Sequence, residues 1–238
     1  MAERERQASD ERAGAGSPLP GSGSANTYIA ALAAELVRSV AIRTTERPRY
    51  RSVHRTAEEI AERARKASME LRAAASDDAG DFAAVVALRK KRDDSALVPE
   101  IDEHVRMEAL RRELDALRPA TERPLRVAAL SVEIADAART LFDHGVRSAR
   151  SESHSAANAA LCASASSLFV ATVNLRELSQ KAMEITHNED LLAWIALKML
   201  ELEQLQRKEL RLRRQMIRRL SAFRKAGPRR RKPPKRVL

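Results

Sequence analysis

The chain has 238 residues, enough for one large domain or two small ones, and 44% of them are apolar, so it is able to bury a core. Only 3% are aromatic and seven are glycine, a composition that favours closely packed helices over a β-sheet. Cys162 is the single cysteine, which excludes an intrachain disulfide, and we expect it in the core. The charged N-terminus lacks the apolar segment of a signal peptide, so we expect a cytoplasmic protein in a reducing compartment.

The net charge of +11 is unevenly distributed. Residues 207–238 contain 15 Lys and Arg and a single acid, Glu209, for a charge of +14. The remaining 29 bases and 32 acids amount to −3. The protein is therefore a near-neutral body with a basic end, and the charge of the body does not indicate a nucleic-acid-binding domain.

The N-terminal region divides into a tail and a helix. Residues 1–16 mix charges with Gly and Ala without periodicity, and we expect them to be disordered. Two prolines and two glycines in Pro18–Gly23 then interrupt helical structure. Ser24 or Asn26 is suited to cap the next helix, predicted over 25–44, whose Ile, Leu and Val residues share one face.

Two long amphipathic segments follow. The first is predicted as a helix over 53–89, and the charged residues 90–100 after it are expected to form a loop. The second is predicted over 101–117. Pro119 is expected to end that helix, because proline has no backbone N–H to continue the hydrogen-bond ladder.

The second half of the body centres on an uncharged segment. Pro124 suits the first turn of a helix over 125–144, and Gly145 suits its C-terminal turn. Residues 153–175 contain no Asp, Glu, Lys or Arg, a length that would span a bilayer. Their Ser, Asn and His side chains would need partners in lipid, so we predict a protein-buried central helix over 153–173.

A shorter helix is expected from about residue 175, and a last helix over 189–223. Gly227 and Pro228 end that helix, and a basic, proline-containing tail follows. The expected organisation is an all-α, multi-helix bundle over 17–226, flanked by a disordered N-terminal tail over 1–16 and a basic C-terminal tail over 227–238.

Generic catalytic motifs are absent from the sequence. There is no GxxxxGK[ST] phosphate loop, no HExxH and no cysteine cluster. The glycines of residues 14–23 do not follow a predicted strand and do not space as GxGxxG. The histidines are scattered through the chain, so no metal site is expected. They are His54, His104, His144, His154 and His187.

Four segments in order carry a more specific pattern. Pro18-Leu19-Pro20-Gly21-Ser22-Gly23-Ser24-Ala25 enters a small-residue helix, and Ala120-Thr121-Glu122-Arg123-Pro124-Leu125 opens another. Ser151-Glu152-Ser153-His154 leads into the uncharged helix, which ends in Val173-Asn174-Leu175. This pattern resembles the cyclodeaminase domain of formiminotransferase-cyclodeaminase and the related methenyltetrahydrofolate cyclohydrolases. That family carries P-x-P-G-G-G-S-A, A-T-E-x-P-L, a Ser-Asp that opens an Ala-rich helix, and I/V-N-L.

The resemblance covers about Pro18 to Leu178 and implies an all-α cyclodeaminase-type bundle that forms a homodimer. Two positions depart from the family pattern. Ser22 stands where the family has the middle glycine, and Glu152 stands where it has aspartate. The Asn-Pro-Asn-like run before that aspartate is replaced by Val146–Arg150.

The implied activity is a lyase or hydrolase reaction on a one-carbon tetrahydrofolate. Glu152 is the candidate catalytic carboxylate, because a carboxylate stabilises an amidinium-like cation and moves a proton. The segment Gly21-Ser22-Gly23-Ser24 is expected to hold the pterin or a substrate carbonyl, and Arg147 or Arg150 to pair with the glutamate tail. The remaining candidate substrate-binding residues are Thr121, Glu122 and His154. No metal or cofactor beyond the tetrahydrofolate substrate is expected.

Plainer interpretations stay open for these residues. Glu152 also suits a helix N-terminus as an ordinary acid, and His154 suits a capping or packing role. The chain as a whole also fits a family member that has lost the chemistry and serves as an interaction protein. A third possibility is a helical module that binds nucleic acid, a membrane surface or an acidic partner through its basic tail. The ridge Leu192–Leu205 on the last helix is a candidate dimer contact.

Overall fold

The computed structural model describes residues 22–96, 102–185 and 188–225, and over these residues the chain is all-α, as predicted. The tails predicted for 1–16 and 227–238 lie outside the described residues. Two short 3₁₀ helices, η1 (Pro48–Val53) and η2 (Arg147–Ala149), connect longer elements. The long helices are α2 (Ser22–Thr45), α3 (His54–Ala96), α4 (Glu103–His144), α5 (Arg150–Ala182) and α6 (Glu189–Lys225).

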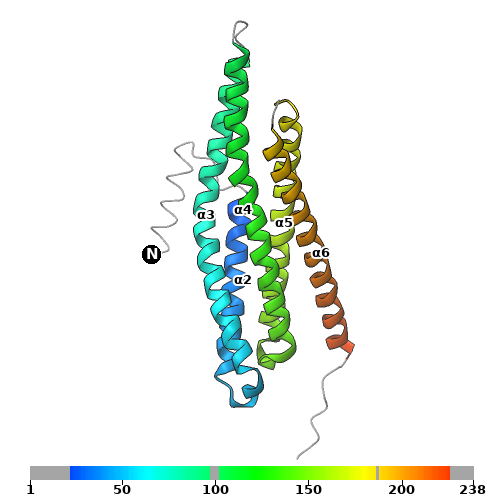
Figure 1. Cartoon of the computed structure of the whole chain (residues 1–238). Coiled ribbons are helices and arrows are strands. Elements are labelled where there is room, and N and C mark those ends of the chain that lie inside the picture. The colour runs from blue at the N-terminus through cyan, green and yellow to red at the C-terminus, as the bar shows by residue number, and fades with distance from the viewer. Residues whose placement is uncertain (1–21, 97–101, 186–187, 226–238) are drawn as a thin grey trace, which may run out of the picture.

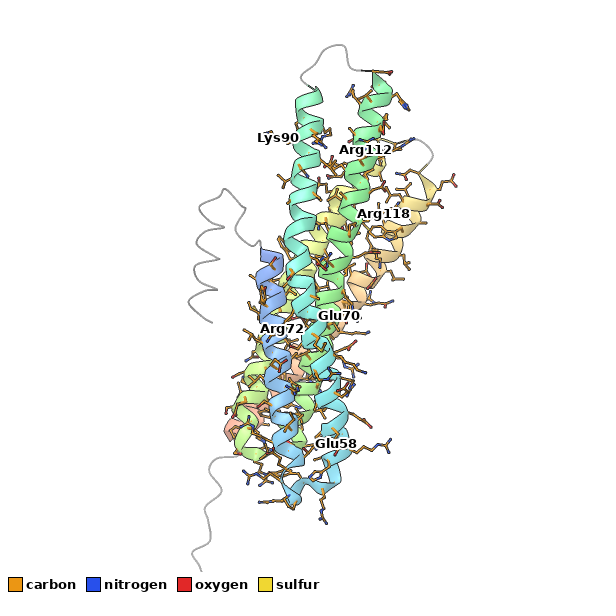
Figure 2. The ribbon with its side chains drawn as sticks, turned by 90° about the vertical axis from the view of Figure 1, so that its left-hand side faces the viewer. Glu58, Glu70, Arg72, Lys90, Arg112 and Arg118 are labelled. Atoms are coloured by element: carbon orange, nitrogen blue, oxygen red, sulfur yellow. The ribbon has the colours of Figure 1, made fainter. Side chains whose placement is uncertain are left out.

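The helices run along one axis, each antiparallel to the next in the chain (Figure 1). α3 and α4 form the longest hairpin and extend past the N-terminal end of α2. Figure 2 shows charged side chains along this hairpin, among them Glu58, Glu70, Arg72, Lys90 and Arg112. α2 packs between α3 and α5, and α4 packs along α5. The bundle is therefore complete in its lower half, whereas its upper half lacks α2.

Small side chains explain the central place of α2. Its buried positions carry alanine and valine on several sides of the helix, which lets neighbouring backbones approach closely. Its buried hydroxyls bond within the helix, as Thr44 Oγ1 donates to the Val40 carbonyl at 2.9 Å and Thr27 Oγ1 to the Gly23 carbonyl at 2.8 Å. Neither of these two buried hydroxyl groups is therefore left without a hydrogen-bond acceptor.

Two apolar clusters divide the core along the axis. The lower cluster joins α2 to all four other helices and includes Val37, Ile60, Ile134 and Leu161. The upper cluster is built by α3, α4, α5 and α6, and its fully buried members include Leu117 and Leu175. Since α2 contributes nothing to the upper cluster, other groups must fill the space beyond its N-terminal end.

The uncharged segment packs with one side against the bundle and exposes the other, so it is only in part the protein-buried central helix that was predicted. The segment Arg147–Ala182 is long and apolar enough to cross a membrane, but half of its most apolar window is buried against other helices. The second helix expected near residue 175 is wrong, because α5 continues to Ala182. Cys162 is exposed on the outer face of α5, so its predicted place in the core is also wrong.

The predicted break at Pro119 is wrong as well, because α4 continues through Pro119 and Pro124. Pro124 has no N–H to give to the Ala120 carbonyl four residues earlier. Asn174 Nδ2 on α5 donates to that carbonyl instead, at 2.7 Å. Pro119 frees the carbonyl of Asp115 in the same way, and Asp115 is exposed, so water can reach it. The loop predicted over 90–100 is also shorter than expected, since α3 reaches Ala96.

The hydrogen bond from Asn174 to the Ala120 carbonyl is expected to contribute to stability. Asn174→Ala leaves the half-buried Ala120 carbonyl without a donor, which is expected to lower the free energy of unfolding by about 1–3 kcal/mol. Pro124→Ala restores a backbone N–H to Ala120, so adding it to Asn174→Ala is expected to recover most of that loss. Urea denaturation of the single and double variants measures both effects.

Asn158→Ala is the matched control, because Asn158 is exposed on the same helix and bonds only the His154 ring among the described residues. Equal losses for Asn158→Ala and Asn174→Ala would show that the carbonyl does not depend on the amide.

Candidate functional site

Three of the four motif segments lie at one level of the bundle, where α2 begins. α2 and α5 are antiparallel, and Arg43 Nη1 lies 3.2 Å from Glu152 Oε1 at their lower ends. Gly23 is 20 residues from Arg43 and Asn174 is 22 residues from Glu152, which places both about 30 Å up the bundle. Asn174 in turn bonds Ala120, the residue next to Thr121. The Gly-Ser, Ala-Thr-Glu and Val-Asn-Leu segments therefore converge (Figure 1).

The side chains of these segments point in different directions. Ser24 and Thr121 are buried, and Thr121 Oγ1 donates to the Leu117 carbonyl at 2.7 Å. Glu122 is exposed and faces α6, where its Oε1 accepts from Trp194 Nε1 at 3.3 Å and lies 3.8 Å from Lys198 Nζ. Of the predicted pair, Thr121 thus faces the interior and Glu122 an outer side of the bundle.

The structure describes the Gly-Ser segment only in part. Gly21 lies outside the described residues, and Ser22 is the first residue of α2, with its side chain outside the description. α2 has no acid in its first turn, so its first N–H groups face no neighbouring carboxylate from the helix itself. A helix start of this kind attracts a carbonyl oxygen or an anion.

Glu152 lies at the opposite end, in the first turn of α5. The Ser151 hydroxyl donates to its Oε2 at 2.7 Å, and Arg43 pairs with its Oε1. The Ser151 hydroxyl, the backbone N–H of Glu152 and the Arg43 guanidinium lower the pKa of this carboxyl below its ordinary value. Within one chain, the structure therefore does not bring Glu152 and Gly23–Ser24 together.

Basic and aromatic groups surround Glu152. Arg147 is exposed, and its backbone N–H donates to the Tyr50 hydroxyl at 3.1 Å. Arg150 Nε donates to the Phe142 carbonyl at 3.1 Å, and its guanidinium lies 5.6 Å from the centre of the Phe142 ring. The predicted residues Arg147, Arg150 and His154 therefore do share one end of the bundle with Glu152.

His154 packs beside Phe142, with 6.4 Å between the ring centres. Its Nε2 lies 3.1 Å from Asn158 Nδ2, while its Nδ1 is buried without a hydrogen-bond partner in the described part of the chain. The orientation suits a packing histidine with one spare ring nitrogen. In the described part of the chain, no group of three or more His, Cys, Asp or Glu side chains is placed to hold a metal ion.

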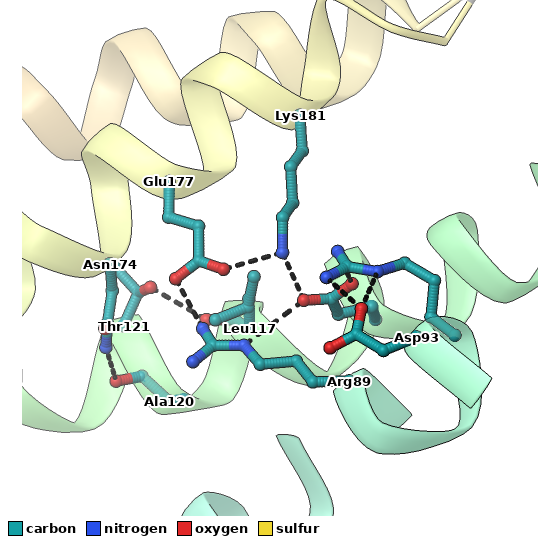
Figure 3. Close-up of polar contacts among 10 residues, drawn as sticks. Arg89, Asp93, Leu117, Ala120, Thr121, Asn174, Glu177 and Lys181 are labelled. Atoms are coloured by element: carbon teal, nitrogen blue, oxygen red, sulfur yellow. Dashed lines mark hydrogen bonds and ion pairs between the residues drawn. The ribbon is translucent and has the colours of Figure 1, made fainter. Parts of the chain in front are cut away.

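An ionic cluster fills the upper half of the bundle where α2 is missing, and sequence analysis did not find it (Figure 3). Glu113 on α4 is 0% exposed and contacts Arg89, Arg92 and Lys181. Arg92 Nη1 lies 2.8 Å from Glu113 Oε2, and Arg89 Nε lies 3.3 Å from Glu113 Oε1. Glu177 on α5 accepts from Lys181 Nζ at 2.6 Å and also contacts Arg89. The cluster joins α3, α4 and α5.

A weak sequence signal pointed to this cluster. Glu113 lies between Leu110, Leu114 and Leu117, on the face of the helix that carries its buried leucines. An acid in that register must either leave the core or find cations. Its cations come from residues 21 to 68 positions away in the sequence, so spacing alone does not reveal them.

The fold and the convergence of three motif segments define an all-α domain of the cyclodeaminase class. The family model described as formiminotransferase-cyclodeaminase matches residues 8–191. The chain therefore belongs to the formiminotransferase-cyclodeaminase family.

A solved structure gives the same fold. The crystal structure of formiminotetrahydrofolate cyclodeaminase from Thermotoga maritima is similar with a TM-score of 0.59 and 20% sequence identity, over 84% of this chain and 90% of that one. No curated protein sequence matches the chain. The family supports a folate-related function for this protein.

Proposed function

We propose that the protein is a folate-dependent one-carbon enzyme of the cytoplasm. It acts as a cyclodeaminase that releases ammonia from 5-formiminotetrahydrofolate, or as a cyclohydrolase that opens 5,10-methenyltetrahydrofolate. The observation that carries the proposal is the convergence of Gly23–Ser24, Thr121 and Asn174 at the start of α2, in a chain of this family. The reaction needs no metal or redox cofactor, because the carbon keeps its oxidation state: the second folate nitrogen adds to the formimino carbon and ammonia leaves, or water adds to the methenyl carbon and one C–N bond breaks.

Both reactions pass through a tetrahedral carbon between two ring nitrogens. A carboxylate near that carbon stabilises the positive charge and transfers a proton. Glu152 suits this role as the carboxylate in the first turn of α5, and its lowered pKa favours the ionised form that stabilises the positive charge. The N–H groups at the start of α2 suit a substrate carbonyl, and Arg147 suits the anionic glutamate tail.

Within one chain, the start of α2 and Glu152 lie at opposite ends of α2, so a second subunit is needed to bring them together. The outer faces of α2 and α5 carry almost no charge, and several large apolar side chains are exposed there. Leu32 is 64% exposed and Phe169 is 69% exposed, with Tyr28 and Val173 about half exposed. An apolar face of this kind is typical of a protein interface. Of the ridge Leu192-Leu200-Leu205 considered on α6, Leu205 is buried within the bundle, whereas Leu192 and Leu200 are 44% and 52% exposed.

A two-fold axis across this face would complete the site. Gly23 and Glu152 lie at opposite ends of the face, each about 15 Å from its middle. A perpendicular two-fold axis through the middle reverses the helix direction of the second copy. The start of α2 in one subunit then approaches Glu152 of the other, so we propose a homodimer with two equivalent sites.

Ligand binding tests the proposal separately from turnover. A folate analogue at about 100 times its dissociation constant is expected to add about 2.7 kcal/mol to the free energy of unfolding, and so to raise the melting temperature. The absorbance of methenyltetrahydrofolate then follows the reaction with purified protein. Stabilisation without turnover of methenyl or formimino substrate identifies a family member that has lost its chemistry. If the analogue has no effect on melting either, the folate proposal fails.

A further inference from the structure

The C-terminal half of α6 carries a row of cations on its outer side. Lys208, Arg211, Arg214, Arg218 and Lys225 are all exposed, and we call them the cationic stripe. At 3.6 residues per turn they fall within an arc of about 120°, and they extend about 26 Å along the helix. The stripe is therefore one continuous surface feature.

The cations of α6 that face the bundle are paired, unlike those of the stripe. Arg219 Nε lies 2.8 Å from Asp143 Oδ2, and Arg213 Nη2 lies 2.6 Å from Glu209 Oε1. Among the described residues, no carboxylate lies within 4.0 Å of a stripe nitrogen. The acids of this region therefore pair with Arg207, Arg213 and Arg219 and leave the stripe without an ion pair among the described residues.

An ordinary solvated helix face in the same molecule looks different. On α3, Arg55 pairs with Glu59 at 3.1 Å, and both Arg65 and Lys66 pair with Glu62. Acids and bases alternate there, so the surface is locally neutral. The separation of charge on α6 is thus not a general property of this chain's exposed helices.

A cleft widens the cationic surface next to the stripe. It has a volume of about 600 Å³ and is lined by residues of α3, α4 and α6. Lys208 and Arg211 of the stripe line it together with Arg63 of α3, while α4 contributes Glu133 and the ion pair of Asp136 with Arg139, so cations outnumber acids in the lining. Arg63 has no carboxylate within 4.0 Å among the described residues, since its Nε contacts only the Glu59 carbonyl, at 3.4 Å. Three unpaired cations from two helices therefore border one cleft.

We infer that this surface binds the phosphate backbone of duplex nucleic acid. Unpaired cations spaced three to seven residues apart along about 26 Å of one helix suit a charged polymer with one phosphate per about 1.7 Å of its axis. Of the exposed apolar side chains on this half of α6, only Leu210 and Ile217 border the stripe and Phe223 lies away from it, so the helix presents too small an apolar face for a membrane surface. Six more cations without an acid follow in the sequence at 229–236. This activity is independent of the proposed folate reaction.

The test is binding of the full chain to a fluorescent 20-base-pair DNA duplex between 50 and 200 mM salt. About five phosphate contacts predict a slope near −4.5 in log affinity against log salt, with a larger magnitude if residues 229–236 take part. The variant K208Q/R211Q/R214Q/R218Q is expected to reduce the magnitude of that slope by about 3.6 and the affinity at least thirtyfold.

The control variant R55Q/R72Q/K90Q/R112Q removes the same charge from exposed positions on α3 and α4 and is expected to change affinity less than threefold. Thermal melts establish that both variants fold. Equal losses in the two variants would reduce the effect to net charge and overturn the inference. It is also overturned if poly-L-glutamate displaces the duplex at equal charge concentration, or if vesicles with 30% anionic lipid bind the protein more tightly than the duplex does.

Discussion

Glu113→Ala is expected to lower the free energy of unfolding by about 3 kcal/mol, the low end of the range for a broken buried ion pair, because it removes a buried carboxylate whose cation partners keep 15–36% of their side chains exposed. Glu113 contacts Arg89, Arg92 and Lys181, and only Glu177 and Asp93 would remain to pair with them. The cluster closes the upper bundle beyond the end of α2. The loss is therefore expected to appear in urea denaturation as a lower midpoint, together with faster amide exchange in the upper parts of α3 and α4.

Glu108→Ala is the matched control for this prediction. Glu108 lies on the same helix and pairs with Arg112, but about half of its side chain is exposed. Exposed pairs of this kind contribute about 0–1 kcal/mol. If the two variants lose the same stability, the cluster does not hold the upper bundle together. Replacing Glu113, Arg89 and Lys181 together by apolar side chains is expected to be far less harmful than Glu113→Ala alone.

The all-α class was predictable because apolar residues recur at helical spacing and glycine is scarce. The number of helices and their ends at proline were not, since two of the predicted breaks are absent from the described residues. The missing N–H of Pro124 is a local fact, whereas the amide that replaces it comes from Asn174, 50 residues later. Sequence rules assume that a freed carbonyl stays without a donor, and a neighbouring helix can supply one.

The candidate site, too, was predictable from the sequence only in part. Its motif segments were visible in the sequence, and the fold brings three of them to one level. Their separation from Glu152 follows from the length of α2, whose 24 residues keep its two ends apart. A motif pattern records which residues occur and in what order, but not whether one subunit or two must supply them. The role of Glu113 was hidden for a related reason, since its partners lie on other helices.

Glu152→Gln is expected to lower kcat by about 10²–10⁴-fold with little change in stability, because the amide keeps the shape of the side chain but carries no charge. Methenyltetrahydrofolate absorbance measures the loss, and Glu58→Gln, at an exposed position on α3, is the control. The Ser151 hydroxyl, the backbone N–H of Glu152 and the Arg43 guanidinium lower the pKa of Glu152 below its ordinary value, so its protonation needs a more acidic pH than that of an ordinary glutamate. Activity that depends on it is therefore expected to fall only at more acidic pH. A tenfold loss or less in the variant would leave Glu152 as an ordinary helix-start acid.

Mixing two inactive variants distinguishes a shared site from a site within one chain. Gly23→Leu obstructs the start of α2, and Glu152→Gln removes the carboxylate at the other end of the face. In a mixed dimer with a shared site, both changes fall on one site and the other site is intact. Random exchange makes half of the dimers mixed, so about one quarter of the wild-type activity is expected to return. If Gly23 and Glu152 acted within one chain, every site would carry one change and mixing would restore nothing.

Leu32→Glu with Phe169→Glu is expected to give inactive monomers by sedimentation, because two charges then face each other across the two-fold axis. An active monomer would show that one chain is sufficient for the reaction.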